Sequence, residues 1–270
     1  MSTASAPVQI GRVALTVNDL AAARAFYEGG LGLETLASDG EGATLGAGGV
    51  PFLELRGDRQ ARRSSAREAG LFHTAFLLPD RAALARWITH AAARGVALQG
   101  ASDHLVSEAI YLADPEGNGI EIYADKPRDV WPREDGRIRM ATERLDLSAL
   151  ARDADGPWVG APAGTVVGHV HMQVGDAAEA ERFWTGTLGF DLMTRYPGAS
   201  FLSTGGYHHH VAANVWNSRG AGRRSLPATG LAEVVLHAES AARDAIVGRA
   251  GSERFEDPWG TPISVEAKPA

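Results

Sequence analysis

Histidines and one glutamate in short apolar segments are the residues of this sequence best suited to chemistry. His73 stands in GLFHTAFLL, His169 in VGHVHMQV and Glu121 in GIEIY. Alternate residues of a half-buried strand face opposite sides, so each of these side chains can point away from its apolar neighbours into a shared hollow. Two neutral imidazoles and one carboxylate can hold a divalent metal ion and leave coordination positions open for other ligands.

An internal repeat indicates which elements position these residues. Residues 10–36 match residues 167–193 without a gap at a constant offset of 157. Each copy begins with an alternating run, followed by Asp19 or Asp176, which we expect to cap a helix beginning at Ala21 or Ala177. The helix ends at a Leu-Gly pair, and short strands follow. The repeat predicts a strand–helix–strands unit.

A second, fainter pair of segments extends the repeat. Residues 70–80 resemble 230–240, and the turns and closing strands at 114–125 and 257–267 also correspond. The sequence therefore predicts four modules, near 8–57, 70–125, 165–217 and 229–267, the fourth shortened by about 17 residues. We expect an N-terminal pair of modules over 8–125, a Pro-, Gly- and charge-rich linker over 126–164, and a C-terminal pair over 165–267.

The four modules resemble the vicinal oxygen chelate superfamily, which includes glyoxalases, bleomycin resistance proteins and extradiol dioxygenases. The resemblance covers nearly the whole chain and rests on IGRVALTVNDL, GLFHTAFLLPD, VSEAIYLADPEGNGIEIYAD, VGHVHMQV and GGYHHHVAAN. It is greatest to the two-repeat catechol 2,3-dioxygenases. It implies an α+β fold of βαβββ modules that pair into two cup-shaped mixed sheets.

The superfamily takes its metal ligands from the first strands of two paired modules and the last strand of one. Pairing modules in chain order leaves both ligand sets incomplete. Pairing module 2 with module 3 gives the complete set of His73, Glu121 and His169, and leaves module 1 to pair with module 4. The equivalent positions of that second cup are Arg12, Glu233 and Ser264. We therefore predict crossed pairing, with an ion pair between Arg12 and Glu233 where the second metal site would be.

The resemblance also implies residues around the metal. Tyr111 stands ten residues before Glu121, and His104 lies near the start of the same strand. A further histidine of the run 208–210 acts as acid and base in this family. Alignment favours His209, whereas alternation places His208 and His210 on one face, so the choice stays open. His171, Tyr207 and Trp216 are predicted to line the substrate pocket.

The implied activity is extradiol-type ring cleavage of a catechol or related diphenol by Fe(II), with Mn(II) as the other metal considered and O2 as co-substrate. A catechol must lose protons to chelate a metal, and a neutral imidazole can accept one. Histidine and tyrosine donors can then stabilise the charge that develops on oxygen.

Three other functions fit parts of the pattern. A hydroquinone-type dioxygenase also uses crossed pairing. A glyoxalase-type isomerase or lyase generally needs two carboxylate ligands, and the spare one, Glu233, lies in the other cup. A metal-free protein that sequesters a small molecule would need no ligand triad, so the intact triad counts against it.

Composition narrows the class of protein. Hydrophobic residues make up 44% and charged residues 22% of the chain, as in ordinary globular proteins. The net charge of −7, without a dense Lys/Arg stripe, argues against nucleic-acid binding. Cysteine is absent, and no apolar run is long enough to cross a membrane. These features predict a soluble, cytoplasmic protein without a nucleic-acid or membrane partner. The family resemblance implies a small aromatic diphenol as substrate and is compatible with a homo-oligomer.

Overall fold

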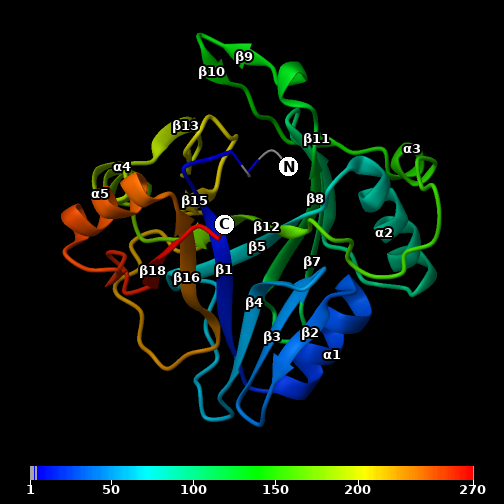
Figure 1. Cartoon of the computed structure of the whole chain (residues 1–270), viewed down its shortest axis with the longest axis horizontal. Helices are drawn as coiled ribbons and strands as arrows, with labels where there is room; N and C mark the ends of the chain where they lie inside the picture. The colour runs from blue at the N-terminus through cyan, green and yellow to red at the C-terminus, as the bar shows by residue number, and fades with distance from the viewer. Residues whose placement is uncertain (1–2, 4, 270) are drawn as a thin grey trace.

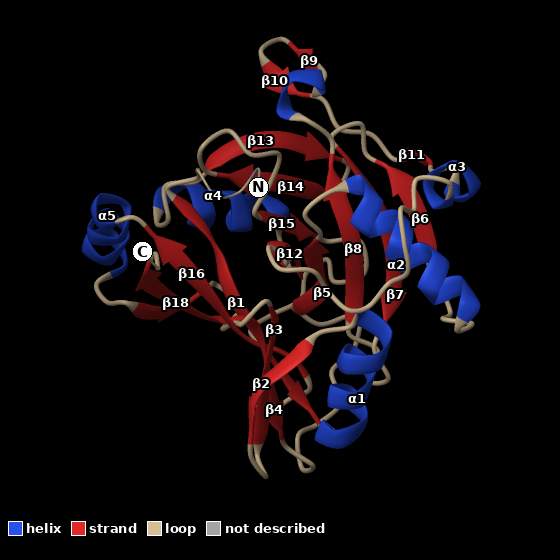
Figure 2. Cartoon of the chain, turned by 45° about the vertical axis from the view of Figure 1, so that its right-hand side comes forward, coloured by secondary structure: helices blue, strands red, loops and turns tan. Residues whose placement is uncertain are grey.

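Two curved mixed sheets form the body of the protein. A computed structural model describes residue 3 and residues 5–269. The sheets have nine and seven strands, and helices lie along their outer sides (Figures 1 and 2). The predicted α+β architecture of curved mixed sheets is confirmed. No helix in the described ranges is long and apolar enough to cross a bilayer.

The elements follow the predicted modules in order. The first module has β1 (Val8–Val17), α1 (Leu20–Leu31), β2 (Glu34–Ser38), β3 (Gly42–Ala47) and β4 (Val50–Gly57). The second has β5 (Gly70–Leu77), α2 (Arg81–Ala93), β6 (Gly100–Asp103), β7 (Ser107–Ala113) and β8 (Gly119–Asp125). The third has β12 (Val166–Gln173), α4 (Ala177–Gly186), β13 (Asp191–Tyr196), β14 (Ala199–Ser203) and β15 (Val211–Asn214). The fourth has β16 (Gly230–Ala238), α5 (Ser240–Ala250), β17 (Arg254–Glu256) and β18 (Pro262–Ala267), one strand fewer than the others.

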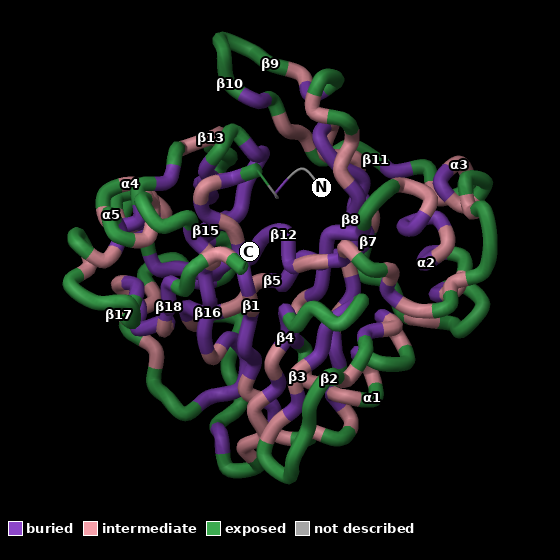
Figure 3. Tube along the Cα trace, viewed as in Figure 1, coloured by how far each residue is buried: buried purple, intermediate pink, exposed green. Residues whose placement is uncertain are grey.

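Strand pairing confirms that the modules cross over. The nine-stranded sheet has the order β11-β6-β7-β8-β5-β12-β15-β14-β13, so the second and third modules meet where β5 pairs antiparallel with β12. The seven-stranded sheet has the order β17-β18-β16-β1-β4-β3-β2, so the fourth and first modules meet at β16 and β1. One apolar core runs through both sheets. Figure 3 shows the buried residues concentrated along the strands.

The capping residues behave as their sequence positions predict. Asp19 accepts a hydrogen bond from the amide of Ala22 at 3.0 Å, and Asp176 accepts one from Glu179 at 2.9 Å. Gly32 ends α1 with φ 71°, the left-handed conformation that favours glycine. These caps fix where each helix leaves its first strand.

The segment between the module pairs carries structure of its own. It contains η1 (Arg128–Val130), β9 (Arg133–Glu134), β10 (Arg137–Ile138), β11 (Glu143–Arg144) and α3 (Leu147–Ala151). The β9–β10 hairpin projects from the body at the top of Figure 1. β11 pairs with β6 and thereby extends the nine-stranded sheet. The prediction that 126–164 forms a linker between two chain-order domains stays a prediction.

Gly119, at the start of β8, offers a test of packing beside the candidate site. A Cβ on this residue would lie 2.0 Å from the carbonyl oxygen of Phe72. Gly119→Ala must therefore push β8 away from β5, and we expect a loss of about 1–3 kcal/mol in the free energy of unfolding. Urea denaturation measures it. Gly186→Ala, where a Cβ meets open space, is the control and should not destabilise the protein.

Candidate metal centre

Three neighbouring strands bring the predicted ligands together. Ala75 of β5 lies opposite His169 of β12 on one side and opposite Glu121 of β8 on the other. His73 is two residues from Ala75, so it lies on the same face of β5. The small side chain of Ala75 leaves the space between the three larger side chains open. This arrangement exists because the second and third modules share one sheet.

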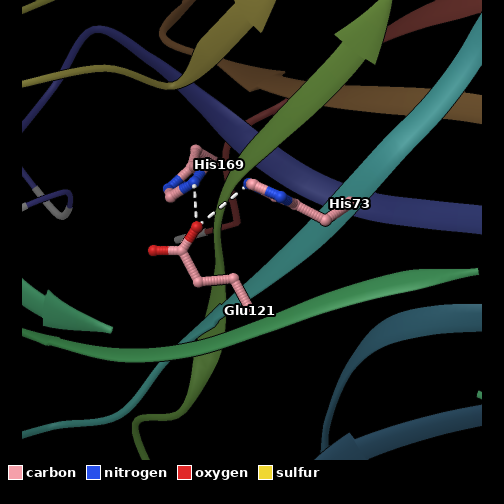
Figure 4. Close-up of side chains that lie close together, drawn as sticks. All are labelled: His73, Glu121 and His169. Atoms are coloured by element: carbon pink, nitrogen blue, oxygen red, sulfur yellow. Dashed lines mark hydrogen bonds and ion pairs between the residues drawn. The ribbon is translucent and has the colours of Figure 1, made fainter. Parts of the chain in front are cut away.

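The three side chains converge on a single point (Figure 4). Nε2 of His73 lies 3.0 Å and Nε2 of His169 lies 3.2 Å from the same oxygen, Oε2 of Glu121. Each residue offers one ligand atom, and these atoms all lie within 4.8 Å of one another. All three residues are buried, with exposed fractions of 6% or less.

The donor set fits a divalent metal ion. The buried Nε2 of His73 forms no hydrogen bond of good geometry within the described part of the chain, although it lies close to a carboxylate. Buried polar atoms are normally satisfied, so an unsatisfied nitrogen aimed at a carboxylate indicates a missing partner between them. A cation shared by Glu121 and both imidazoles would satisfy all three groups. Imidazole and carboxylate ligands suit iron(II) and related metals.

The ionisation states also suit metal binding. Burial raises the pKa of Glu121, but His169 and His73 outweigh burial and hold this pKa well below its usual value. Burial lowers the pKa of His169 to about 4, against the opposing effect of Glu121. Near pH 7 the carboxyl group is therefore ionised and His169 is neutral, the forms in which these groups coordinate metals.

These shifts predict how the metal-free protein responds to acid. His169 has a pKa of about 4 when folded and an ordinary value of 6.5 when unfolded, so acid favours the unfolded state. The contribution of neutral His169 to the free energy of unfolding is fully present above pH 6.5 and is lost as the pH falls toward 4. We expect the free energy of unfolding to fall by about 2 kcal/mol from this residue between pH 7 and pH 5. Urea denaturation at the two values tests this, and His169→Gln should make the dependence on pH shallower.

A cavity of about 810 Å³ opens from the three ligands. Its wall next to the ligands is aromatic and comes from several strands. The ring centre of His171 lies 4.8 Å from that of His73, 4.9 Å from that of Phe72 and 5.3 Å from that of Trp216. Phe201 also lines this wall. The volume and the flat aromatic surfaces suit a small aromatic molecule.

Tyr111 and His104 lie together at the cavity, as their positions in sequence predict. Nε2 of His104 is 2.6 Å from the hydroxyl of Tyr111, and Nδ1 is 2.7 Å from the carbonyl oxygen of Ala141. A carbonyl can only accept, so Nδ1 of His104 carries a proton, whereas either Nε2 or the Tyr111 hydroxyl can be the donor between them. Burial and the nearby Glu121 raise the pKa of Tyr111 well above 10.0, so its hydroxyl stays protonated.

The run of three histidines divides between the cavity and the interior. His209 lines the cavity, and its ring centre lies 4.0 Å from that of His169. His208 and His210 are fully buried and do not line the cavity. The run precedes β15, so it lies outside the strand whose alternation left the choice open. The structure brings His209 to the ligands and turns the other two histidines away.

Hydrogen bonds behind His209 define its tautomer. The carboxylate of Asp125 accepts from Nε2 of His208 at 2.8 Å, so a His208 ring with a single proton carries it on Nε2 and offers Nδ1 as an acceptor. Nδ1 of His209 lies 2.8 Å from that atom and donates to it. Neutral His209 therefore has no proton on Nε2. Burial, with smaller effects of His169 and His208, lowers the pKa of His209 well below its ordinary value and keeps the ring neutral.

The predicted pocket residues have different places. His171 lines the cavity, and its Nε2 accepts from the side-chain amide of Asn214 at 2.9 Å. Trp216 lines the cavity too and is 45% exposed, which places it at the mouth. Tyr207 lies behind the cavity wall, fully buried, where its hydroxyl donates to Asp125 at 3.2 Å.

Two contributions to the site had escaped the sequence analysis. Residues 140–142, in the predicted linker, form part of the cavity wall, and Ala141 holds His104. Asp125 orders His208 and, through it, His209. A role for Asp125 could have been predicted from the sequence, because alternation along β8 puts it on the same face as Glu121. The 140–142 segment carries no motif.

The second cup is occupied by charge pairs, but the predicted partners are wrong. Glu233 is buried and is bound by Arg56 at 2.6 Å, Arg254 at 3.2 Å and Ser264 at 2.5 Å. Arg12 instead pairs with glutamates 54 and 266 at 3.3 and 3.6 Å. Strand position alone pairs Arg12 with Glu233, whereas arginines of β4 and β17 lie closer to this carboxylate. The acceptors of Glu233 are thus satisfied without a metal.

A family model for the glyoxalase/bleomycin resistance protein/dioxygenase superfamily matches residues 9–122 and 166–242, more than half of the chain. The chain belongs to this superfamily. It is 39% identical to a catechol-2,3-dioxygenase of Bacillus subtilis (strain 168) over 241 residues, which cover 86% of this chain and 83% of that protein. The expected resemblance to the catechol 2,3-dioxygenase branch is confirmed.

Solved structures of the superfamily share the fold at low sequence identity. A Bacillus subtilis protein provisionally described as a dioxygenase superimposes with a TM-score of 0.65 at 15% identity, over 97% of this chain and 86% of that one. Glyoxalase I of Zea mays superimposes with a TM-score of 0.59 at 15% identity, over 96% and 92%. At these identities the likeness concerns the fold and not the reaction.

Proposed function

We propose that this enzyme is an iron(II)-dependent extradiol dioxygenase that opens the ring of a catechol or related diphenol with O2. The relationship to the catechol-2,3-dioxygenase supports an extradiol dioxygenase activity. The iron, the diphenol and the roles of individual residues are what the proposal adds. The observation that carries it is the convergence of His73, Glu121 and His169 at the end of an aromatic cavity.

In this proposal the three side chains hold the metal ion, with two neutral imidazole nitrogens and one carboxylate oxygen. When bound, iron(II) would supply the redox chemistry by which dioxygen adds across the ring bond beside the hydroxyl groups. Three protein ligands leave positions open for the substrate oxygens and O2. The rings of His171 and Phe72 lie next to that of His73, with centres 4.8 and 5.3 Å away, where they can pack against a flat substrate.

His209 serves as the base that prepares the substrate. Its unprotonated Nε2 is the nitrogen left over after Nδ1 donates to His208. A catechol hydroxyl that reaches this nitrogen can transfer its proton to it, and the same proton can later return to the product. His208 and Asp125 hold the ring and stabilise the positive charge that it gains.

Tyr111 supplies a hydrogen-bond donor at the opposite side of the site. Its pKa is raised, so the hydroxyl keeps its proton near pH 7. When Nε2 of His104 donates to the Tyr111 oxygen, the hydroxyl proton is left to stabilise negative charge on a substrate oxygen. His104 positions this hydroxyl and is itself held by the carbonyl of Ala141. The structured segment 126–164 thus contributes to the site through the carbonyl of Ala141 and through the part of the cavity wall formed by residues 140–142.

The proposal is tested with protein loaded with iron(II) under nitrogen and then mixed with air-saturated catechols. We expect oxygen uptake to match the ring-opened product mole for mole. Mass and NMR spectra of the product identify the bond that was cleaved. Cleavage beside the hydroxyl pair supports the proposal, whereas cleavage of hydroquinones in preference to catechols replaces it with the hydroquinone-type activity. Binding of a diphenol without oxygen uptake contradicts both dioxygenase activities.

The glyoxalase-type alternative is disfavoured by the donor set. Among the described residues, the candidate ligands are His73, His169 and Glu121, so the group contains one carboxylate. Glu233 lies in the other sheet, where two arginines bind it. A site that needs two carboxylate ligands therefore has only one. A glyoxalase assay with methylglyoxal and glutathione should give no activity above that of the buffer.

A further inference from the structure

The cavity has a second polar end, away from the candidate metal ligands. It is formed by the loop before β5 and the segment before β16, and Arg224 lies in its wall. Nη2 of Arg224 donates to the carbonyl oxygen of Leu231 at 2.6 Å, and Nη1 lies 3.5 Å from Oγ1 of Thr261. Arginine has five side-chain N–H donors, so these two contacts leave three available to a ligand of the cavity that Arg224 lines.

The charge of Arg224 is not neutralised by direct contact. No carboxylate oxygen in the described part of the chain lies within ion-pair distance of it. Glu68, which also lines this end, is held by Arg62 through two contacts of 2.9 Å. Asp257 is held by the amides of its own turn, at 2.9 Å from Trp259 and 2.7 Å from Thr261.

Arg195 shows how differently a cavity arginine can be placed. It also lines the cavity, but its guanidinium forms two contacts with Glu181, at 2.9 and 2.6 Å. Its charge is already matched. Burial lowers the pKa of Arg224, although Asp257 and Glu68 act in the opposite direction. The guanidinium cation has therefore lost part of its hydration, which is unfavourable. An incoming anion would offset that loss.

The spacing between the two ends suits one substituted aromatic ring. A Cβ on Gly70 would lie 3.6 Å from Nε of Arg224, so the guanidinium is adjacent to the start of β5. His73 follows Gly70 by three residues on that strand, which corresponds to about 10 Å along it. Phe72 and His171 line the wall between these two points. Arg224 and the three metal ligands line the same cavity, so a ring whose hydroxyls lie at the ligands can reach Arg224 with a substituent on its far side.

We infer that the substrate is a catechol that carries a carboxylate on the side of the ring opposite its hydroxyls, and that Arg224 binds this carboxylate. The inference rests on the proposed function for the position of the hydroxyl groups. Guanidinium and carboxylate form strong paired hydrogen bonds, and neighbouring neutral donors such as Asn217 and Gln173 suit an anion. The carboxylate thereby selects the substrate and fixes the ring direction in the cavity.

Binding is measured by titration calorimetry on iron-loaded protein under nitrogen, so that no turnover is needed. The probes are 3,4-dihydroxybenzoate, 3,4-dihydroxyphenylacetate and 4-methylcatechol. We expect at least one of the acids to bind about tenfold or more tightly than 4-methylcatechol. Arg224→Gln should remove this preference by about 10- to 100-fold while leaving the affinity for 4-methylcatechol within about threefold. In air, the same variant should raise KM for the acid much more than it lowers kcat.

Two further variants separate charge recognition from structural damage. Arg195→Gln, at a cavity arginine that is already paired, should keep the preference for the acid. Arg224→Lys keeps the charge and should retain part of the preference, and thermal unfolding confirms that each variant is folded. A wild-type protein that prefers 4-methylcatechol, or an Arg224→Gln variant that keeps the preference, would overturn the inference.

The outcomes also distinguish this inference from the proposed function. Arg224-dependent binding of an acid without ring cleavage in air contradicts the dioxygenase activity and supports the anion site. Ring cleavage with no dependence on Arg224 contradicts the anion site and supports the dioxygenase activity. Failure of all three probes to bind contradicts both.

Discussion

Glu121→Ala is expected to abolish iron retention and ring cleavage while the protein stays folded. Glu121 supplies the oxygen on which both imidazoles converge, at 3.0 and 3.2 Å. Loss even of an outer partner of a metal ligand costs about 10- to 100-fold in metal affinity, so loss of a ligand should cost more than about 100-fold. Iron per chain is measured after desalting, and circular dichroism checks the fold. His73→Ala should behave in the same way.

Glu233→Ala is the matched control in the seven-stranded sheet. Glu233 occupies the position that corresponds to His73, and it is buried among Arg56, Arg254 and Ser264. Its removal should cost about 1–3 kcal/mol in the free energy of unfolding and leave iron content unchanged. Loss of iron in Glu233→Ala with retention in His73→Ala would place the metal in the other sheet.

The second large effect is expected for His209→Phe, which should lower kcat by about 100- to 10,000-fold without loss of iron. The variant removes the unprotonated Nε2 at the cavity and keeps a flat ring against His169. Iron content and kcat are measured on the same preparation. A variant that keeps its iron and its full kcat would show that another group removes the substrate proton.

His210→Phe provides the comparison for this experiment. His210 belongs to the same run, but it is fully buried away from the cavity, where its Nδ1 lies 2.8 Å from Oγ of Ser203. We expect a loss of stability, because the Ser203 hydroxyl and the amide of Thr204 both lose their contact with Nδ1 of His210, and a much smaller change in kcat. If the two substitutions lowered kcat equally, the effect of His209→Phe would be structural.

The sequence predicted the fold because its repeat is periodic and its caps are local. Asp19 and Asp176 each cap a helix through contacts within three residues of themselves. The crossed pairing could be predicted because only the second and third modules together supply two histidines and a glutamate at the three ligand positions. The types of His73, Glu121 and His169 therefore carry information about a long-range contact. The shortened fourth module was also visible as a changed offset, and it corresponds to the missing strand.

Other features depend on side-chain packing between distant segments, which alternation alone does not specify. Arg12 and Glu233 are oppositely charged and lie on paired strands, yet each forms its ion pairs with residues of other strands. Tyr207 lies behind the cavity because the 207–210 run leaves the regular strand. Ala141 and Arg224 lie in segments without a motif, and only the folded chain brings them to the cavity.

Anomalous diffraction at the iron absorption edge, from crystals grown with iron(II), shows whether the nine-stranded sheet holds the catalytic metal. We expect one strong peak in contact with Nε2 of His73, Nε2 of His169 and the Glu121 carboxylate. A peak elsewhere, or iron bound at Glu233 in the seven-stranded sheet, would contradict it.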